Sequence, residues 1–111
     1  MPISPEAISG QVEQLKAALV EQGRRVQSLL ETAFTALFNR DMTLARTVEA
    51  LDTAVDQADV KIEQDAVELL TAATRESAQM PPQQLRGVLT IVKINNEVER
   101  IADAGVDIAE L

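Results

Sequence analysis

The sequence contains neither cysteine nor histidine, and this double absence removes most of the usual side-chain chemistry of enzymes. Without a thiol or an imidazole the chain forms no disulfide, no zinc-finger type of metal site and no cysteine- or histidine-based catalytic centre. Its serines have no visible base, and its four glycines form no phosphate-binding loop. We therefore expect a binding or regulatory protein rather than an enzyme. The lack of cysteine also fits a reducing, cytoplasmic location.

Aromatic residues and proline are scarce as well. There is no Trp or Tyr, and Phe34 and Phe38 are the two aromatic side chains among 111 residues. The core must therefore be built from Leu, Ile, Val and Ala, which favours helices. Proline occurs only at positions 2, 5, 81 and 82, so two long stretches are free of the strongest helix breaker.

Positively charged residues are few: the chain contains 18 acidic and 10 basic residues, which gives a net charge of −8. Such a chain repels phosphate backbones and anionic lipids, which argues against binding to nucleic acid or to a membrane surface. Cations or basic protein surfaces are the expected partners. The apolar runs are too short for direct membrane insertion, and the first residues lack the regions of a signal peptide.

What the sequence does contain is helical periodicity. Ser4 followed by Pro5 is typical of a helix N-terminus, and Asp41 is positioned to cap a second helix. Apolar residues then recur every three or four positions, which predicts helices over about 5–39, 42–75 and 81–110, separated by short connections at 39–41 and 76–80. Because short connections make neighbouring helices antiparallel, we expect an all-α fold, an antiparallel three-helix bundle, with 1–111 as a single domain.

Each predicted helix has one main apolar stripe. The positions of the three stripes are Ile8, Val12, Leu15, Leu19, Val26, Leu29, Ala33 and Leu37; Leu44, Val48, Leu51, Val55, Ala58, Ile62, Ala66 and Leu69; and Ile91, Ile94, Val98, Ile101, Gly105 and Ile108. The first stripe has a gap at Gln22-Gly23. Four further valines, Val60, Val67, Val92 and Val106, lie off these stripes, where they either widen the core or form the contact of a homodimer.

Acidic residues form a stripe of their own on the second helix, at Glu49, Asp52, Asp56, Asp59 and Glu63. Like charges at this spacing repel by ~0.2 to 0.5 kcal/mol per pair, and the four from Asp52 to Glu63 have no Lys or Arg three or four residues away. The third helix repeats the pattern at Glu99, Asp103 and Asp107.

The two acidic stripes are placed to meet. Asp52 and Asp103, and likewise Asp56 and Glu99, are equidistant in sequence from the connection near residue 77, so a hairpin sets each pair at about the same level. Four converging carboxylates suit hard cations such as Mg²⁺, Ca²⁺, Mn²⁺ or oxidised iron, with Asn95 or Asn96 as neutral ligands or hydrogen-bond donors. Two alternatives stay open: a solvated acidic face, or pairing of the stripe with Arg24 and Arg25 of the first helix.

The segment 93–103, which ends Glu99-Arg100-Ile101-Ala102-Asp103, resembles the Glu-Arg-Ile-Gly-Asp signature of the PhoU family. The ending Asp107-Ile108-Ala109-Glu110, the pair Leu85-Arg86 and the acidic motif 52–56 also match family motifs, in the family's order. Ala102 and Ala104 depart from the family pattern, and typical members carry two such three-helix units in one chain.

The resemblance implies a negative regulator or accessory of phosphate uptake and phosphate signalling that acts through protein contacts. It makes Asp52, Asp56, Glu99 and Asp103 candidate metal ligands, with Glu49, Asp59, Glu63 and Asp107 as weaker candidates. Iron is the metal it favours, and Mg, Mn or Zn are alternatives. The implied partners are a phosphate transporter or phosphate-sensor protein, which would hold the chain peripherally at the inner membrane. A metal-free structural adaptor is the competing interpretation.

Overall fold

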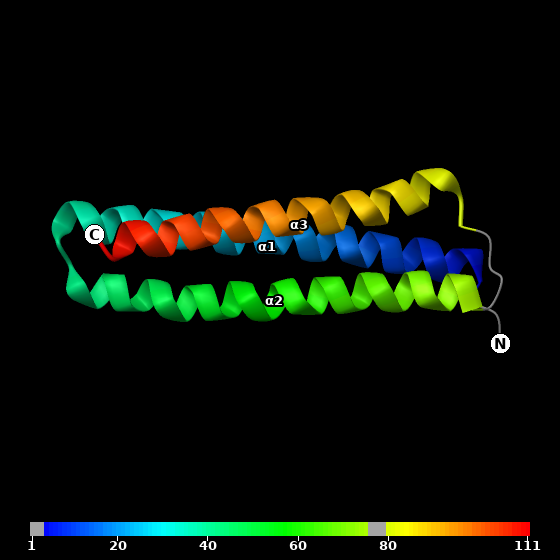
Figure 1. Cartoon of the computed structure of the whole chain (residues 1–111), viewed down its shortest axis with the longest axis horizontal. Coiled ribbons are helices and arrows are strands. Elements are labelled where there is room, and N and C mark those ends of the chain that lie inside the picture. The colour runs from blue at the N-terminus through cyan, green and yellow to red at the C-terminus, as the bar shows by residue number, and fades with distance from the viewer. Residues whose placement is uncertain (1–3, 76–79) are drawn as a thin grey trace.

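Three long helices in mutual contact make up the fold of the computed structural model, which describes residues 4–75 and 80–111. They are α1 (Pro5–Asn39), α2 (Met42–Arg75) and α3 (Pro82–Ala109). The bundle measures 56 × 21 × 16 Å, and α2 runs opposite to both α1 and α3 (Figure 1). The predicted all-α three-helix bundle is therefore confirmed. Part of the expected connection at 76–80, residues 76–79, lies outside the described residues.

The helix ends are formed by the expected capping residues. Ser4 Oγ accepts a hydrogen bond from the Ala7 N–H at 3.1 Å, and Pro5 occupies the first turn. At the other end of α1 the chain reverses through Arg40, whose φ of 51° is left-handed. Asp41 then caps α2, because its Oδ1 accepts from the N–H groups of Thr43 and Leu44 at 3.0 and 3.1 Å.

The core consists of two apolar clusters along the bundle axis. One lies toward the α2–α3 connection and contains Ile8, Val12, Leu15, Ile62, Ala66, Leu69, Val88 and Ile91. The other lies toward the α1–α2 connection and contains Val26, Leu29, Ala33, Val48, Val55 and Ala102. Most of these residues belong to the predicted stripes of the first two helices, so those stripes do face the core.

Between the two clusters lies a layer of buried polar side chains, one from each helix: Gln22, Asp59 and Asn95. Gln22 Nε2 donates to the Val55 carbonyl at 2.7 Å, and Asn95 Nδ2 donates to the Asp59 carboxylate. The gap in the α1 stripe at Gln22-Gly23 is thus the α1 contribution to this polar layer.

The predicted apolar stripe of the third helix is wrong at two positions. Ile94 and Ile101 are 43% and 47% exposed, and their neighbours Asn95 and Ala102 are buried in their place, whereas Gly105 is buried as predicted. α3 turns its small residues inward because it approaches α1 closely: a Cβ at Gly105 would overlap the side chain of Leu29.

The four valines outside the stripes divide into two pairs. Val92 and Val106 are partly buried and pack against the two core clusters, so the core interpretation holds for them and they are not a free patch. Val60 and Val67, on α2, are 50% and 62% exposed. The homodimer itself stays a prediction.

Candidate metal centre

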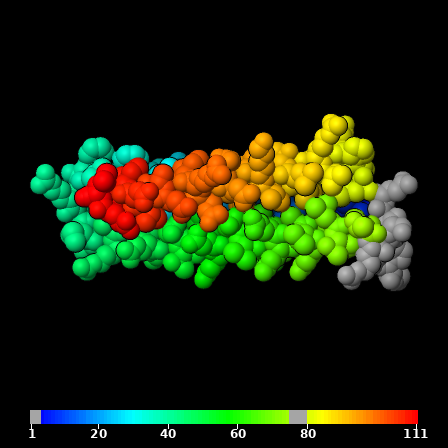
Figure 2. Space-filling model, viewed as in Figure 1, coloured from blue at the N-terminus to red at the C-terminus, as the bar shows by residue number. Residues whose placement is uncertain are grey.

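Three carboxylates from two helices converge at the seam between α2 and α3. Asp52 and Asp56 lie one turn apart on α2, and Asp103 comes from α3; each offers one oxygen, and these oxygens lie within 4.8 Å of one another. Two oxygens on opposite sides of a Ca²⁺ ion are about 5 Å apart, so this spacing is compatible with a shared cation. We call these three residues the acidic triad. Figure 2 shows the side chains of α2 and α3 meeting along one face of the molecule.

Glu99, the fourth candidate ligand, lies one turn before Asp103 on α3 and is half-buried. Its pKa is raised to about 7, first by a hydrogen bond with the Asp59 carboxylate, then by burial and by the negative charges of Asp59, Asp103 and Asp56. A carboxylic acid with this pKa holds a proton near neutrality, and a cation can take the place of that proton.

The pKa of the Asp52 carboxyl group is also raised. Burial raises its pKa, and the neighbouring charges of Asp56 and Asp103 raise it further. Its Oδ1 is buried and has no hydrogen-bond partner among the described residues. A buried carboxylate oxygen without a donor is costly, and a bound cation would satisfy it.

The weaker candidates fall into two groups. Glu49, Glu63 and Asp107 are exposed and are not part of the acidic triad. Asp59 is 7% exposed and accepts from Asn95, which places it in the polar layer next to Glu99. Its burial was missed from the sequence, although its three-residue spacing from both Asp56 and Ile62 puts it at the edge of the core stripe.

The two arginines proposed to neutralise the stripe are engaged elsewhere. Arg24 forms an ion pair with Glu21, and Arg25 Nη1 donates to Gln22 Oε1 at 3.4 Å. Among the ion pairs in the described part of the chain, none includes Glu99 or a triad residue. Pairing of the stripe with Arg24 and Arg25 is therefore not found in the described part of the chain. The unneutralised carboxylates are hard oxygen donors suited to Mg²⁺, Mn²⁺, Ca²⁺ or Fe³⁺, and a solvated acidic face stays the competing interpretation.

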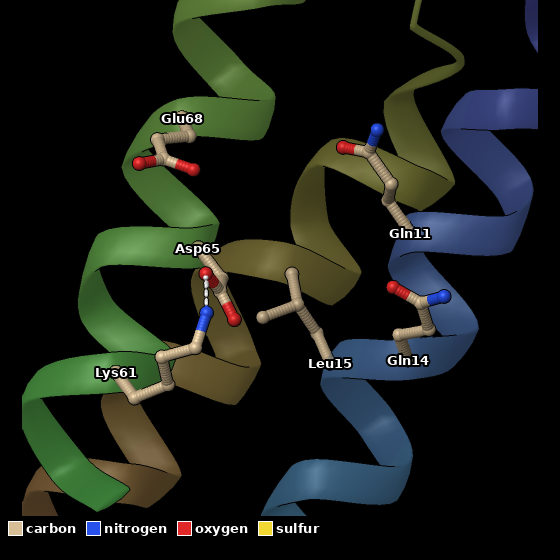
Figure 3. Close-up of a pocket in the computed structure, with 6 residues that line it drawn as sticks. All are labelled: Gln11, Gln14, Leu15, Lys61, Asp65 and Glu68. Carbon is tan, nitrogen blue, oxygen red and sulfur yellow. Dashed lines mark hydrogen bonds and ion pairs between the residues drawn. The ribbon is translucent and has the colours of Figure 1, made fainter. Parts of the chain in front are cut away.

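A polar hollow of about 280 Å³ between α1 and α2 is distinct from the triad. Gln11 and Gln14 come from α1, and Lys61, Asp65 and Glu68 from α2 (Figure 3). Lys61 Nζ pairs with Asp65 at 2.7 Å, so the charges in this hollow are partly compensated within α2. Among the described residues, the hollow contains no group of three potential metal-ligating side chains.

The chain is similar over most of its length to proteins of one known family. The model of the PhoU domain matches residues 19–111. The chain is 30% identical over 95 residues to the phosphate-specific transport system accessory protein PhoU of Edwardsiella tarda, covering 86% of this chain and 37% of that protein. It is 32% identical over 100 residues to the protein of the same name from Escherichia coli, covering 86% and 39%.

A third relative, PhoU homolog 1 of Thermotoga maritima, is 34% identical over 87 residues, covering 77% of this chain and 34% of that protein. No solved structure gives a significant match. The chain thus spans well under half the length of these relatives. Their names describe transport accessory proteins, in agreement with the expected non-enzymatic class. Since the family match extends over most of the sequence, the chain belongs to the PhoU domain family.

Proposed function

We propose that residues 1–111 act as one PhoU-like regulatory unit that binds a hard cation at Asp52, Asp56, Asp103 and Glu99. The observation that carries this proposal is the convergence of the acidic triad within 4.8 Å, on a seam where the described ion pairs offer no compensating base. Asp59 contributes from the edge of the site, through its hydrogen bond with Glu99. Glu49, Glu63 and Asp107 stay outside it.

Iron is the metal that the family resemblance favours, and Mg, Mn and Zn are the alternatives. An all-oxygen donor set suits Fe³⁺, Mn²⁺ and Mg²⁺ better than Zn²⁺, which usually takes nitrogen or sulfur ligands. Within the proposal the bound cation neutralises the repelling carboxylates and joins α2 to α3.

Thermal unfolding with and without cation tests the site. Added Mn²⁺, Mg²⁺ or Fe³⁺ should raise Tm, because a ligand that binds only the folded state stabilises it. The double substitution Asp52→Asn with Asp56→Asn should abolish the rise, and in the absence of metal it should stabilise the protein slightly, by ~0.2 to 0.5 kcal/mol per repelling pair removed.

The matched control is Glu49→Gln with Glu63→Gln, which removes two acids from the same helix outside the triad and should keep the metal response. A metal response that survives the Asp52 and Asp56 substitutions would reject these ligands. No response to any of the cations would favour the metal-free adaptor.

The biological role we propose is regulation of phosphate uptake and phosphate signalling in the cytoplasm. The relatives are named as accessory proteins of the phosphate-specific transport system, which supports a phosphate transporter or phosphate-sensor protein as the partner. The described helices include no segment with the length and hydropathy of a membrane span. Within the proposal, the partner holds the chain at the inner membrane.

Co-purification of the tagged chain with the phosphate transporter of its own genome tests this role. We expect the transporter to be recovered with the unmodified protein, and phosphate uptake to change when the chain is removed from the cell. Unchanged uptake together with no transporter recovered would contradict it.

A further inference from the structure

Asn95 holds Asp59 at two points in the polar layer of the core. Its side chain is fully buried, and its Nδ2 group donates both to the Asp59 carboxylate and, at 3.4 Å, to the Asp59 backbone carbonyl. Its own Oδ1 is buried and has no hydrogen-bond partner among the described residues. A buried amide oxygen without a donor lowers stability. What Asn95 contributes in the described structure is therefore its hold on Asp59.

Glu99 lies one turn after Asn95, on the same side of α3. Its carboxyl group forms a hydrogen bond with the Asp59 carboxylate. Asp59 thus contacts Asn95 on its buried side and Glu99 on the side of the α2–α3 seam. The three side chains form a hydrogen-bonded chain that runs from the core to the candidate metal centre.

Asn95 is too far from the acidic triad to bind the same cation directly. It lies eight residues before Asp103, which is about 12 Å along the axis of α3, and Glu99 lies halfway between them. Oxygen ligands bind hard cations at about 2.0 to 2.6 Å. The neighbouring amide, Asn96, is exposed and does not belong to the polar layer. Asn95 therefore reaches the centre only through Asp59 and Glu99.

We propose that Asn95 is a positioning residue of the candidate metal centre: it fixes the Asp59 carboxylate, which in turn keeps Glu99 at the seam. This inference rests on the proposed cation site and deepens it. A ligand held in place before the cation arrives loses less conformational freedom on binding. Hydrogen-bond partners behind the ligands of metal sites typically contribute about tenfold to a hundredfold to affinity.

Titration of Mn²⁺ into the metal-free full chain tests the proposal, with free Mn²⁺ counted by electron paramagnetic resonance. Asn95→Leu removes the N–H donor and leaves the charge of the site unchanged, so a loss of affinity cannot come from lost charge. The Kd should rise about tenfold to a hundredfold. The matched control is Gln22→Leu, which removes the other fully buried amide of the layer, a donor to the Val55 carbonyl. It should change the Kd less than about twofold, because Gln22 donates to backbone and not to Asp59.

A second background separates positioning from a general loss of stability. Asp59→Leu removes the carboxylate through which Asn95 acts, so adding Asn95→Leu to it should leave the Kd unchanged. The same addition should raise Tm, because it removes a buried amide that has lost its acceptor. Two apolar side chains then replace the polar pair, which keeps the comparison usable if Asn95→Leu alone does not fold.

The possible failures are distinguishable. Equal Kd values for the unmodified protein and Asn95→Leu would overturn this inference and leave the proposed cation site in place. So would a further loss of affinity when Asn95→Leu is added to Asp59→Leu, because Asn95 would then act by a route other than Asp59. An unmodified protein that binds neither Mn²⁺ nor Fe³⁺ would reject the cation site and this inference with it.

Discussion

Asp59 and Glu99 join the buried interior of the bundle to the acidic surface. Asp59 accepts from the buried Asn95, and Glu99 forms a hydrogen bond with Asp59 while it also feels the charges of Asp56 and Asp103. Each of these carboxyl groups therefore responds to both the packing of the polar layer and the charge at the seam. Substitutions here should affect stability and cation affinity together.

The raised pKa of Glu99 predicts a pH dependence with a definite sign. Its pKa is 4.5 in the unfolded chain and about 7 in the folded one, so the folded state binds the proton more tightly. The resulting stabilisation is fully present below the unfolded pKa and is lost as the pH rises through about 7, and the raised pKa of Asp52 acts in the same direction.

We therefore expect the metal-free Tm to fall between about pH 5.5 and pH 8. Glu99→Gln should flatten this fall, and a cation should raise Tm more at the higher pH because its ligands must lose their protons. Differential scanning calorimetry in chelator checks both points. A metal-free Tm that rises over this interval would contradict the assignment.

A second prediction concerns the two buried amide side chains of the polar layer, Asn95 and Gln22. Asn95→Leu removes the donor to Asp59 and leaves a buried carboxylate less satisfied, which should lower the free energy of unfolding by ~1 to 3 kcal/mol. Gln22→Leu is the matched control: it removes a buried amide whose acceptor, the Val55 carbonyl, is a helical backbone group, and it should cost less. Urea unfolding of the two variants measures the difference. Equal losses of unfolding free energy would show that the hydrogen bond from Asn95 to Asp59 contributes no more to stability than the one from Gln22 to the Val55 carbonyl.

At the scale of the helices, hydrophobic periodicity predicted all three helices and the inward faces of α1 and α2, but it misplaced two positions of the α3 stripe. Ile94 and Ile101 are seven residues apart and imitate a core stripe, yet they are exposed. The core selects small residues on α3, because Leu29 and Leu30 of α1 lie against Gly105. Hydrophobicity favours the larger side chain, and no local signal in the sequence shows how closely two helices approach.

The sequence predicted the candidate metal centre in part. Spacing placed Asp52 and Asp56 on one face of α2, and the symmetry of the helical hairpin brought Asp103 to their level, where the structure has it. The burial of Asp59 and its contact with Asn95 depend on how α3 rotates against α2. Periodicity predicted Ile94 and Ile101 as inward positions, whereas Asn95 and Ala102 are buried, so the sequence did not predict this rotation.

The packing of the helices predicts that the same substitution has opposite effects on stability at Gly23 and Gly105. Gly105→Ala should be less stable than Gly23→Ala, because the new methyl group at 105 would displace the buried Leu29 whereas position 23 is open. We expect Gly23→Ala to gain ~0.5 to 1 kcal/mol and Gly105→Ala to lose up to ~2 kcal/mol after the same gain in helix propensity. Thermal unfolding of the two monomers is the check. A Gly105→Ala variant as stable as Gly23→Ala would contradict the close approach of α1 and α3.

For the molecule as a whole, the candidate metal centre and the apolar groove lined by Phe34 and Ile101 lie on different surfaces of the bundle. The acidic triad lies on the α2–α3 seam, and the groove lies between α1 and α3.

The most direct measurement of the central claim is elemental analysis of protein purified without chelator, beside the Asp52→Asn, Asp56→Asn variant purified in the same way. The account predicts at least one equivalent of iron, manganese or another hard cation per chain in the unmodified protein, and its loss from the variant, with both proteins folded by circular dichroism. Metal retained at the same level by the variant, or less than a tenth of an equivalent in the unmodified protein even after incubation with Fe³⁺ or Mn²⁺, would contradict it.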